Sequence, residues 1–313
     1  MTFAAWNVRT LIDRDTNICP ERKTAIVARE LRRYNVDVAA ISETHLADEG
    51  ELVEHGGEYT FYWKGTPASE PRRSGVGFAI KSAIVKKLVE CPVFISDRII
   101  TLRLHLENNQ YLNLISVYAP TMTNDDDIKE RFYEELAATL SGIRPVEKIL
   151  LLGDLNARVG RDYEAWPRVL GRHGIGNMNS NGQMLLSLCA QFGLAITNTY
   201  FRLPIKHKVT WMHPRSKHWH LIDYAIVRQA DISQVLVTRV MRGAECWTDH
   251  KLVVTKVKLR LRPPVRSNRV NSARLDVNKL ASMETRNSYC HALNNATSTI
   301  DTDGDLQMTW DLQ

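Results

Sequence analysis

A polar tetrapeptide, Thr248-Asp249-His250-Lys251, stands just before an apolar run that reaches Val257. Imidazole titrates near neutral pH, and a nearby carboxylate fixes its tautomer and stabilises its charged form. We therefore expect His250 to carry acid–base chemistry with Asp223 as its partner, while Asp249 faces a metal ion or a bound water. The alternative is a solvated Asp249 and a His250 that caps the following strand. The tetrapeptide alone does not separate these two interpretations.

Five further motifs precede this tetrapeptide, and each places a polar side chain at or just after the end of a predicted strand. They are Trp6-Asn7, Ser42-Glu43-Thr44-His45, Tyr118-Ala119-Pro120, Gly153-Asp154-Leu155-Asn156 and Ile222-Asp223-Tyr224. Side chains at the ends of many strands can converge on one cleft. The ordered set therefore favours a catalytic site over six separate structural roles.

Glu43 follows the predicted buried strand 36–41. A carboxylate at the end of a buried strand is an oxygen ligand of the kind that hard divalent ions such as Mg²⁺ prefer. Glu43 is therefore our first candidate for a Mg²⁺ ligand. Its structural alternative is a surface carboxylate at the end of a strand.

Asp154 and Asn156 are two residues apart. On an extended backbone both side chains point to the same side, and Leu155 points to the core. This spacing predicts a shared site. The alternative is an Asx turn, in which the two side chains bond only to local backbone groups.

The ordered motifs resemble the endonuclease/exonuclease/phosphatase superfamily. Within it, the phrases 6–11, 153–160 and 181–199 are most similar to the endonuclease domain of non-LTR retrotransposons, which craniofacial development protein 2-like proteins also carry. The resemblance covers roughly residues 1–260. It implies an α/β protein of the deoxyribonuclease I-like class, a four-layered α/β sandwich in which two packed mixed β-sheets are flanked by helices.

The resemblance also implies roles for individual residues. Asp154 would orient or deprotonate the attacking water, and Asn156 would donate its amide to a phosphate oxygen. Tyr118 would hydrogen-bond the scissile phosphate or the leaving oxygen, although a tyrosine at a strand end is ordinarily part of the sheet core. Asn7 would join Glu43 and Asp249 at the metal. The implied activity is a Mg²⁺-dependent DNA endonuclease that leaves 3′-hydroxyl ends, with Mn²⁺ as a substitute ion.

Four residues are candidates for contact with DNA. Arg72 and Arg73 offer positive charge, and Lys217 and Trp219 combine a cation with an aromatic face that could stack on a base. A solvated loop is the alternative in each case. The two histidines beside Trp219 lack further ligands at compatible spacing, so no zinc site is expected.

Composition sets wide limits on the partners. The 313 residues include 41 Lys and Arg against 35 Asp and Glu, a formal charge of +6 that is compatible with a polyanionic substrate. The five cysteines are scattered and odd in number, which favours neither a disulfide framework nor a structural zinc site. No signal-peptide pattern or membrane-spanning run is present in the sequence. We expect an intracellular protein of the nucleus or the cytoplasm, with DNA as its partner and no membrane or obligate protein partner.

Apolar periodicity predicts the order of the elements. Predicted strands span 3–8, 36–41, 76–80, 99–106, 112–118, 149–152, 194–197, 221–227, 235–240 and 252–259, and predicted helices span 24–34, 127–140, 182–192 and 277–293. Paired prolines at 263 and 264 end the last strand because they remove two backbone donors. We therefore expect one catalytic domain at 1–262. The segment 263–313 would be a partly helical or disordered tail, a remnant of a connection to a missing reverse transcriptase.

Two other functions are compatible with the same sequence. A phosphomonoesterase acting on inositol phosphates would share the fold and the metal site, since only the surrounding loops differ. A catalytically silent, domesticated module would keep the fold and bind DNA, chromatin or a protein. The presence of every catalytic residue named above favours an enzyme.

Overall fold

The computed structural model describes residues 1–13, 21–263 and 282–297. The chain divides into two units, Met1–Pro263 and Pro264–Gln313. In the described part of the second unit, helix α5 (Met283–Thr297) overlaps the predicted helix 277–293, whose first five residues lie outside the described residues. No helix in the described ranges is long and apolar enough to cross a membrane. The independence of a domain at 1–262 stays a prediction.

The first unit contains a seven-stranded mixed sheet, here called sheet 1. Its strands, in spatial order, are β14 (Val235–Met241), β15 (Leu252–Val257), β1 (Thr2–Asn7), β2 (Val38–Ser42), β5 (Val76–Lys81), β4 (Tyr59–Lys64) and β3 (Glu49–Glu54). Strand β1, in the interior of the sheet, is buried on both faces. Phe3 and Ala5 point to one apolar core, and Ala4 and Trp6 point to another, which is why its sequence is a nearly continuous apolar run.

A second mixed sheet of six strands, sheet 2, packs against sheet 1. Its strands, in spatial order, are β10 (Leu194–Ile196), β13 (Asp223–Arg228), β9 (Lys148–Asp154), β8 (Tyr111–Tyr118), β7 (Ile99–His105) and β6 (Val93–Ser96). Alternate residues of both sheets fill the core between them. Phe78 of sheet 1 and Leu114 and Leu152 of sheet 2 are members of this core, and all three are fully buried.

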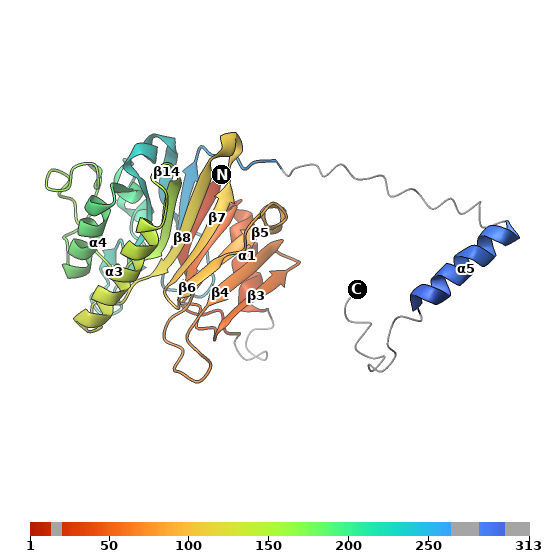
Figure 1. Cartoon of the computed structure of the whole chain (residues 1–313). Helices are drawn as coiled ribbons and strands as arrows, with labels where there is room; N and C mark the ends of the chain where they lie inside the picture. Colours follow the sequence, from red (N-terminus) through yellow and green to blue (C-terminus); the bar gives the residue numbers. More distant parts are fainter. Residues whose placement is uncertain (14–20, 264–281, 298–313) are drawn as a thin grey trace. The chain divides into compact units, whose positions relative to one another are not determined.

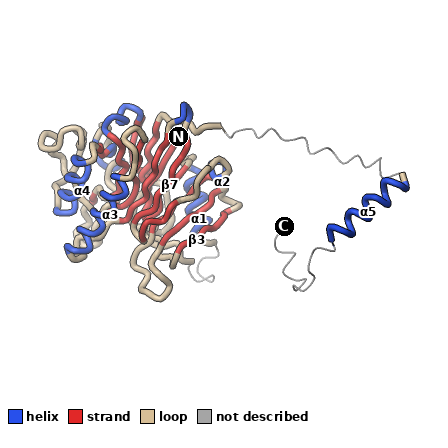
Figure 2. Tube along the Cα trace, viewed as in Figure 1, coloured by secondary structure: helices blue, strands red, loops and turns tan. Residues whose placement is uncertain are grey.

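Helices cover the outer face of each sheet (Figures 1 and 2). Helix α1 (Lys23–Arg33) packs on sheet 1 through one buried apolar cluster. Helices α3 (Asp126–Ser141) and α4 (Ser180–Gln191) pack on sheet 2 through another. The shorter helical segments are α2 (Ser82–Val85), η1 (Glu107–Asn109), η2 (Thr197–Thr199), η3 (Ile205–His207) and η4 (Gln229–Gln234). The order helix, sheet, sheet, helix confirms the predicted four-layered α/β sandwich.

Strand direction brings the polar motifs to one edge of the sandwich. Strands β1 and β2 are parallel, with Asn7 opposite Ser42, and β8 and β9 are parallel, with Tyr118 opposite Asp154. Strand β13 runs antiparallel to β9, so its first residue, Asp223, lies opposite Asp154. Strand β15 runs antiparallel to β1 and therefore begins at the same edge. Carboxyl ends of some strands and amino ends of others thus meet at one place.

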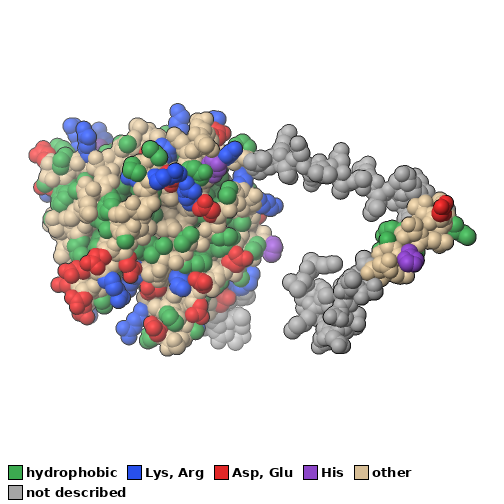
Figure 3. Space-filling view, in the orientation of Figure 1, with side chains coloured by type: hydrophobic (Ala, Val, Ile, Leu, Met, Phe, Trp, Pro, Cys, Tyr) green, Lys and Arg blue, Asp and Glu red, His purple; other side chains and the backbone are tan. Residues whose placement is uncertain are grey.

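Five strands were not predicted from the sequence. They are β3, β4, β6 and the two strands of a short hairpin, β11 (Trp211–Met212) and β12 (Trp219–His220). Strands β3 and β6 lie at sheet edges and alternate exposed with partly buried residues, so their apolar signal is weak. On the face drawn in Figure 3, acidic side chains gather over α3 and basic side chains lie at several separate places.

Candidate active site

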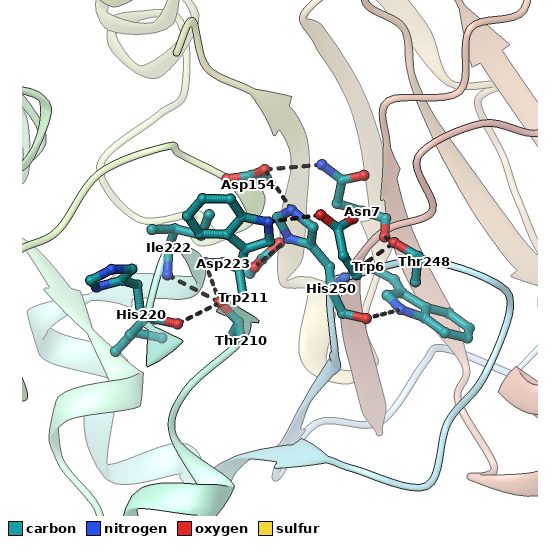
Figure 4. Close-up of polar contacts among 12 residues, drawn as sticks. Trp6, Asn7, Asp154, Thr210, Trp211, His220, Ile222, Asp223, Thr248 and His250 are labelled. Atoms are coloured by element: carbon teal, nitrogen blue, oxygen red, sulfur yellow. Dashed lines mark hydrogen bonds and ion pairs between the residues drawn. The ribbon is translucent and has the colours of Figure 1, made fainter. Parts of the chain in front are cut away.

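Asp154, the last residue of β9, is the centre of the site (Figure 4). Its side chain is 1% exposed, and both of its oxygens accept hydrogen bonds. Asn7 Nδ2 donates to Oδ2 at 3.0 Å, and the backbone N–H of Asn156 donates to Oδ1 at 2.9 Å. Because Asn7 belongs to sheet 1 and Asp154 to sheet 2, this contact joins the two sheets at their common edge.

His250 and Asp223 form a buried pair beside Asp154 (Figure 4). His250 Nδ1 lies 3.0 Å from Asp223 Oδ2, which places a proton on Nδ1, and Nε2 lies 3.9 Å from Asp154 Oδ2. Backbone contacts fix the pair. Thr210 Oγ1 accepts from the N–H of Asp223 at 3.3 Å, and Asn198 Nδ2 donates to the Asp223 carbonyl at 3.2 Å. The imidazole is therefore held with Nε2 facing Asp154.

Two pKa shifts follow from this arrangement. Burial lowers the pKa of His250, but the charges of Asp223, Asp154 and Asp249 and the hydrogen bond that the imidazole donates to Asp223 outweigh it and raise that pKa to about 9. For Asp154, burial and the charge of Asp223 raise the pKa well above its ordinary value, against the opposing effects of His250 and Asn7. At neutral pH the imidazole is charged, and Asp154 holds a proton more readily than a solvent-exposed carboxyl group.

Tyr118 and Glu43 complete the group of charged and polar side chains at this edge. Tyr118 is buried, and its pKa is raised by burial first, then by the charges of Glu43 and Asp154. It is therefore an O–H donor at neutral pH. Glu43 follows β2 in a left-handed conformation (φ 59°), which is rare for a residue other than glycine and is a recurrent feature of functional sites. Its carboxylate remains partly exposed, and Oε1 lies 3.6 Å from His45 Nε2.

The residues at the site are chemically suited to a hard divalent ion. Atoms of Asp154, Asp223 and His250 lie within 4.8 Å of one another, and Asp223 Oδ1 is buried with no hydrogen-bond partner among the described residues. In this buried trio, however, Nδ1 of His250 already bonds to Asp223. The carboxylate of Glu43 and the amide oxygen of Asn7 are the oxygen ligands that Mg²⁺ prefers. Asn7 ends β1 and Glu43 follows the neighbouring strand β2, and their role at a metal stays a prediction.

Two predicted site residues differ from their expected arrangement. Asn156 is not on an extended backbone, because its φ is 44°; the Asx turn is present, and its Nδ2 donates to the carbonyl of Ala119 at 2.9 Å. The expectation that the two side chains point to the same side of a strand was wrong, since β9 ends at Asp154. Asp249 is exposed, and its Oδ2 accepts from Trp211 Nε1 at 2.9 Å. Its role at a metal stays a prediction.

The four predicted DNA contacts lie on loops and the short hairpin. Arg72 and Arg73 are exposed in the connection between β4 and β5. Lys217 is exposed in the β11–β12 hairpin, and Trp219 is partly buried in β12 with the guanidinium of Arg242 at 5.5 Å from its ring. None of the four predicted residues bonds to Asp154, Asp223 or His250 within the described ranges, so their roles stay predictions.

Sequence reasoning named Lys217 and Trp219 of the hairpin but missed Thr210 and Trp211 as part of the site. Trp211 pairs with His250 in an isolated antiparallel bridge, and their ring centroids are 6.2 Å apart. Thr210, the preceding residue, accepts from the backbone N–H groups of Ile222 and Asp223. No periodicity in the sequence identifies these residues, because their contacts depend on how a two-residue strand folds back on the catalytic strands.

The turn that carries Glu43 is fixed by the loop before β5. The N–H groups of Thr44 and His45 each donate at 3.1 Å, to the carbonyls of Gly75 and Ser74 respectively. Gly75 has φ +122°, and a Cβ there would lie 2.2 Å from Thr44 Oγ1, so only glycine fits. The Ser74 hydroxyl donates to the carboxylate of Asp97 in sheet 2.

Arg98 extends this connection to Tyr118. Its Nη1 donates to the Tyr118 carbonyl at 3.1 Å, and its guanidinium lies 5.4 Å from the centroid of the Tyr118 ring. The backbone N–H of Tyr118 in turn donates to the Arg98 carbonyl at 3.0 Å. Because Arg98 follows Asp97 directly, Glu43 of sheet 1 and Tyr118 of sheet 2 are held by one continuous set of contacts.

Comparison with known proteins agrees with this arrangement. Residues 4–250 match the Endonuclease/Exonuclease/phosphatase family. Craniofacial development protein 2 of Bos taurus is 32% identical over 260 residues, which cover 83% of this chain and 41% of the relative, and the same protein of Tragulus javanicus is also 32% identical over 260 residues, 83% of this chain and 42% of the relative. The chain thus spans about two fifths of the length of these curated relatives.

Solved structures show the same fold at low sequence identity. The catalytic domain of Xenopus laevis APE2 has a TM-score of 0.60 and 16% identity, with 83% of this chain and 93% of that chain covered. The endonuclease domain of TRAS1, a telomere-specific non-LTR retrotransposon, has a TM-score of 0.54 and 15% identity, with 82% of this chain and 98% of that chain covered. The predicted resemblance is confirmed.

Proposed function

The chain belongs to the endonuclease/exonuclease/phosphatase family, and from that premise we propose that it is a Mg²⁺-dependent phosphodiester hydrolase that nicks DNA and leaves 3′-hydroxyl ends. One observation carries the proposal. Asn7, Asp154, His250 and Asp223 form a buried polar chain at the edge where the two sheets meet. A polar set of this kind combines a carboxylate that can act as a base with a charged imidazole, and both groups can accelerate hydrolysis of a phosphodiester.

In the proposed reaction Asp154 accepts a proton from the attacking water. The water oxygen forms a bond to phosphorus, the bond from phosphorus to the 3′ oxygen breaks, and that oxygen takes up a proton to become the 3′-hydroxyl. Asn7 fixes the Asp154 carboxylate by donating to Oδ2, so that the base keeps one orientation. This fixed orientation at the carboxyl end of β9 supports the assignment of Asp154 as the base.

His250 and Tyr118 act on the phosphate in this proposal. Asp223 holds the imidazole in its charged form, whose Nε2–H would stabilise the negative charge that grows on a phosphate oxygen. Tyr118, an O–H donor, would hydrogen-bond the phosphate or the leaving oxygen. Mg²⁺, held by Glu43 and Asn7, would neutralise phosphate charge when bound.

The first test is nicking of supercoiled plasmid by the purified chain, with Mg²⁺ and then with a chelator. We expect nicking that the chelator abolishes. Glu43→Gln should weaken the Mg²⁺ response, because an amide lacks the anionic oxygen that a hard cation prefers. Asp154→Asn should bind DNA but turn over on the order of a hundredfold more slowly. Asp127→Asn, an exposed change on α3, is the matched control.

A double variant distinguishes a shared reaction from separate structural effects. Combining Asp154→Asn with His250→Ala should cost much less than the product of the two single losses, because residues that act together are non-additive. Wild-type nicking rates in all of the site variants, with circular dichroism confirming the fold, would refute the assignment. Phosphate release from an inositol polyphosphate with intact plasmid would instead support a phosphomonoesterase. Binding of DNA by a wild-type chain that cleaves neither substrate would support a silent module.

A further inference from the structure

A pocket, here called the side pocket, lies beside sheet 2, away from Asp154. Its volume is about 1090 Å³, enough for a nucleotide-sized ligand. Strand β13 has six residues, with Asp223 at its first position and Arg228, which lines the side pocket, at its last. At about 3.3 Å per residue, roughly 17 Å separate these two positions. The side pocket is therefore distinct from the catalytic edge.

Hydrogen bonds fix one wall of the side pocket, which is formed by residues 167–173, before α4 in the chain. The N–H groups of Gly171 and His173 donate to the side chain and the carbonyl of Thr199, at 2.7 and 2.8 Å. The buried ammonium of Lys208 donates to the His173 carbonyl at 2.6 Å, and the Tyr200 hydroxyl donates to the Arg168 carbonyl. A wall held in this way needs little rearrangement to receive a ligand, which lowers the entropic cost of binding.

The charge of the side pocket is positive. Arg168, Arg172 and Arg228 line it, against one carboxylate, Glu164. Arg228 donates to the carbonyls of Glu147 and Arg144, at 2.8 and 3.3 Å, and neutral carbonyls leave its charge uncompensated. In the described part of the chain, neither Arg168 nor Arg172 forms an ion pair with a carboxylate. This excess of guanidinium groups favours an anion, and a phosphate in particular.

Aromatic rings supply a second kind of contact in the side pocket. Tyr163, Phe192 and Tyr200 line it, and the guanidinium of Arg172 lies 5.8 Å from the ring of Tyr163. Flat rings and guanidinium planes are the surfaces on which nucleobases stack. Arg168 has φ 63°, a left-handed conformation that costs energy for an arginine and persists here at the rim.

We propose that the side pocket binds a nucleotide, with its phosphate on Arg168 and Arg172 and its base against Tyr163. The same chemistry is offered by a free mononucleotide and by the terminal nucleotide of a nucleic acid strand. The pocket does not use Asp154, Glu43 or His250, so the proposal stands independently of the hydrolase assignment.

The test is calorimetric titration of the full chain with adenosine monophosphate in the presence of a chelator, which removes any ion from the catalytic edge. The double variant Arg168→Ala/Arg172→Ala should bind roughly tenfold more weakly or worse, since each charged hydrogen bond contributes substantially to affinity. Arg202→Ala removes an exposed arginine that does not line the pocket and should bind like wild type. Tyr163→Leu should lose affinity for the mononucleotide but keep affinity for inorganic phosphate.

Further titrations separate the two sources of the nucleotide. A 5′-phosphorylated tetranucleotide that binds at least as tightly as the mononucleotide indicates a strand end, and a weaker tetranucleotide indicates a free nucleotide. Equal binding of the mononucleotide by wild type and the double arginine variant would overturn the proposal. Absence of binding by wild type would overturn it as well, as would equal affinity for inorganic phosphate and the mononucleotide.

Discussion

Replacing Asp223 by Asn tests the chemistry of the buried pair directly. An amide keeps the size and can still accept from Nδ1–H of His250, but it removes the largest of the three carboxylate charges that raise the imidazole pKa from 6.5 to about 9. Burial then opposes the remaining charges of Asp154 and Asp249, so the pKa should return toward its ordinary value. At pH 7.5 a group with a pKa near 9 is about 97% protonated, and a group at its ordinary value is about 9% protonated. The charged fraction of His250 therefore falls about tenfold, and we expect nicking at pH 7.5 to fall by at least that factor.

The expected loss depends on pH, and the sign follows from the direction of the shift. Protonated His250 is the active form in this proposal, so wild-type activity should fall as pH rises through about 9. Activity of Asp223→Asn should fall one to three pH units earlier, and the two proteins should converge near pH 5.5, where both imidazoles are charged. On the acid side the raised pKa of Asp154 limits the wild type, and it limits Asp223→Asn less, because the charge of Asp223 contributes to that shift.

The assay is a plasmid nicking series from pH 5.5 to 10 at constant ionic strength, because salt alone changes DNA affinity. Asp127→Asn serves as the control for loss of one exposed carboxylate. A ratio of wild-type to Asp223→Asn activity that stays constant across this range would refute the role of the imidazole charge, and would leave Asp223 as a residue that only shapes the site.

Three further outcomes are expected. The melting temperature of the metal-free protein should fall between pH 6.5 and 9. The folded-state pKa of His250 is raised, so its protonation stabilises the fold below pH 6.5, and this stabilisation is lost as pH rises through about 9. Calorimetry should show a smaller fall in melting temperature for His250→Gln. In Ser74→Ala the turn that carries Glu43 loses its bond to Asp97, so the Mg²⁺ concentration for half-maximal nicking should rise several-fold and the Mg²⁺-induced thermal shift should shrink. Turnover at saturating Mg²⁺ should stay near the wild-type value. A lower melting temperature with an unchanged Mg²⁺ response would instead indicate a purely structural role. A chain ending at Arg262 should melt like the full chain, and a drop of several degrees, the shift produced by about 1 to 2 kcal/mol, would show that the tail is packed on the domain.

The strands and the motifs could be predicted because they depend on local signals, and the family and the four layers were implied by the resemblance that those motifs carry. Apolar runs such as 149–152 mark buried strands, and Gly153-Asp154-Leu155-Asn156 marks the end of one of them. The direction of the strands then brings Asn7, Tyr118 and Asp223 to the edge at which Asp154 ends β9. The strand neighbours and directions behind this convergence, parallel for β1/β2 and β8/β9 but antiparallel for β13/β9, are not given by order along the chain, and the sequence implied them only through the family resemblance.

The remaining features depend on contacts between distant segments. Trp211 reaches Asp249 only because a two-residue strand folds back, and edge strands such as β3 alternate too weakly to be recognised. The φ of 44° at Asn156 follows from an Asx turn, which the sequence offered only as an alternative to an extended backbone. The bond from Ser74 to Asp97 crosses between sheets and has no signature in either segment.

The meeting of Asn7 and Asp154 across two sheets has a consequence for how the protein can change over time. The distance between these side chains is set by the thickness of the apolar layer that includes Phe78 and Leu152. A methyl group added to or removed from that layer shifts Asn7 relative to Asp154. Misplacement of reacting groups by a fraction of an ångström slows a reaction that depends on their positions. Residues far from any substrate are therefore under selection for spacing as well as for stability, and neutral drift in this layer should proceed by paired exchanges that conserve volume.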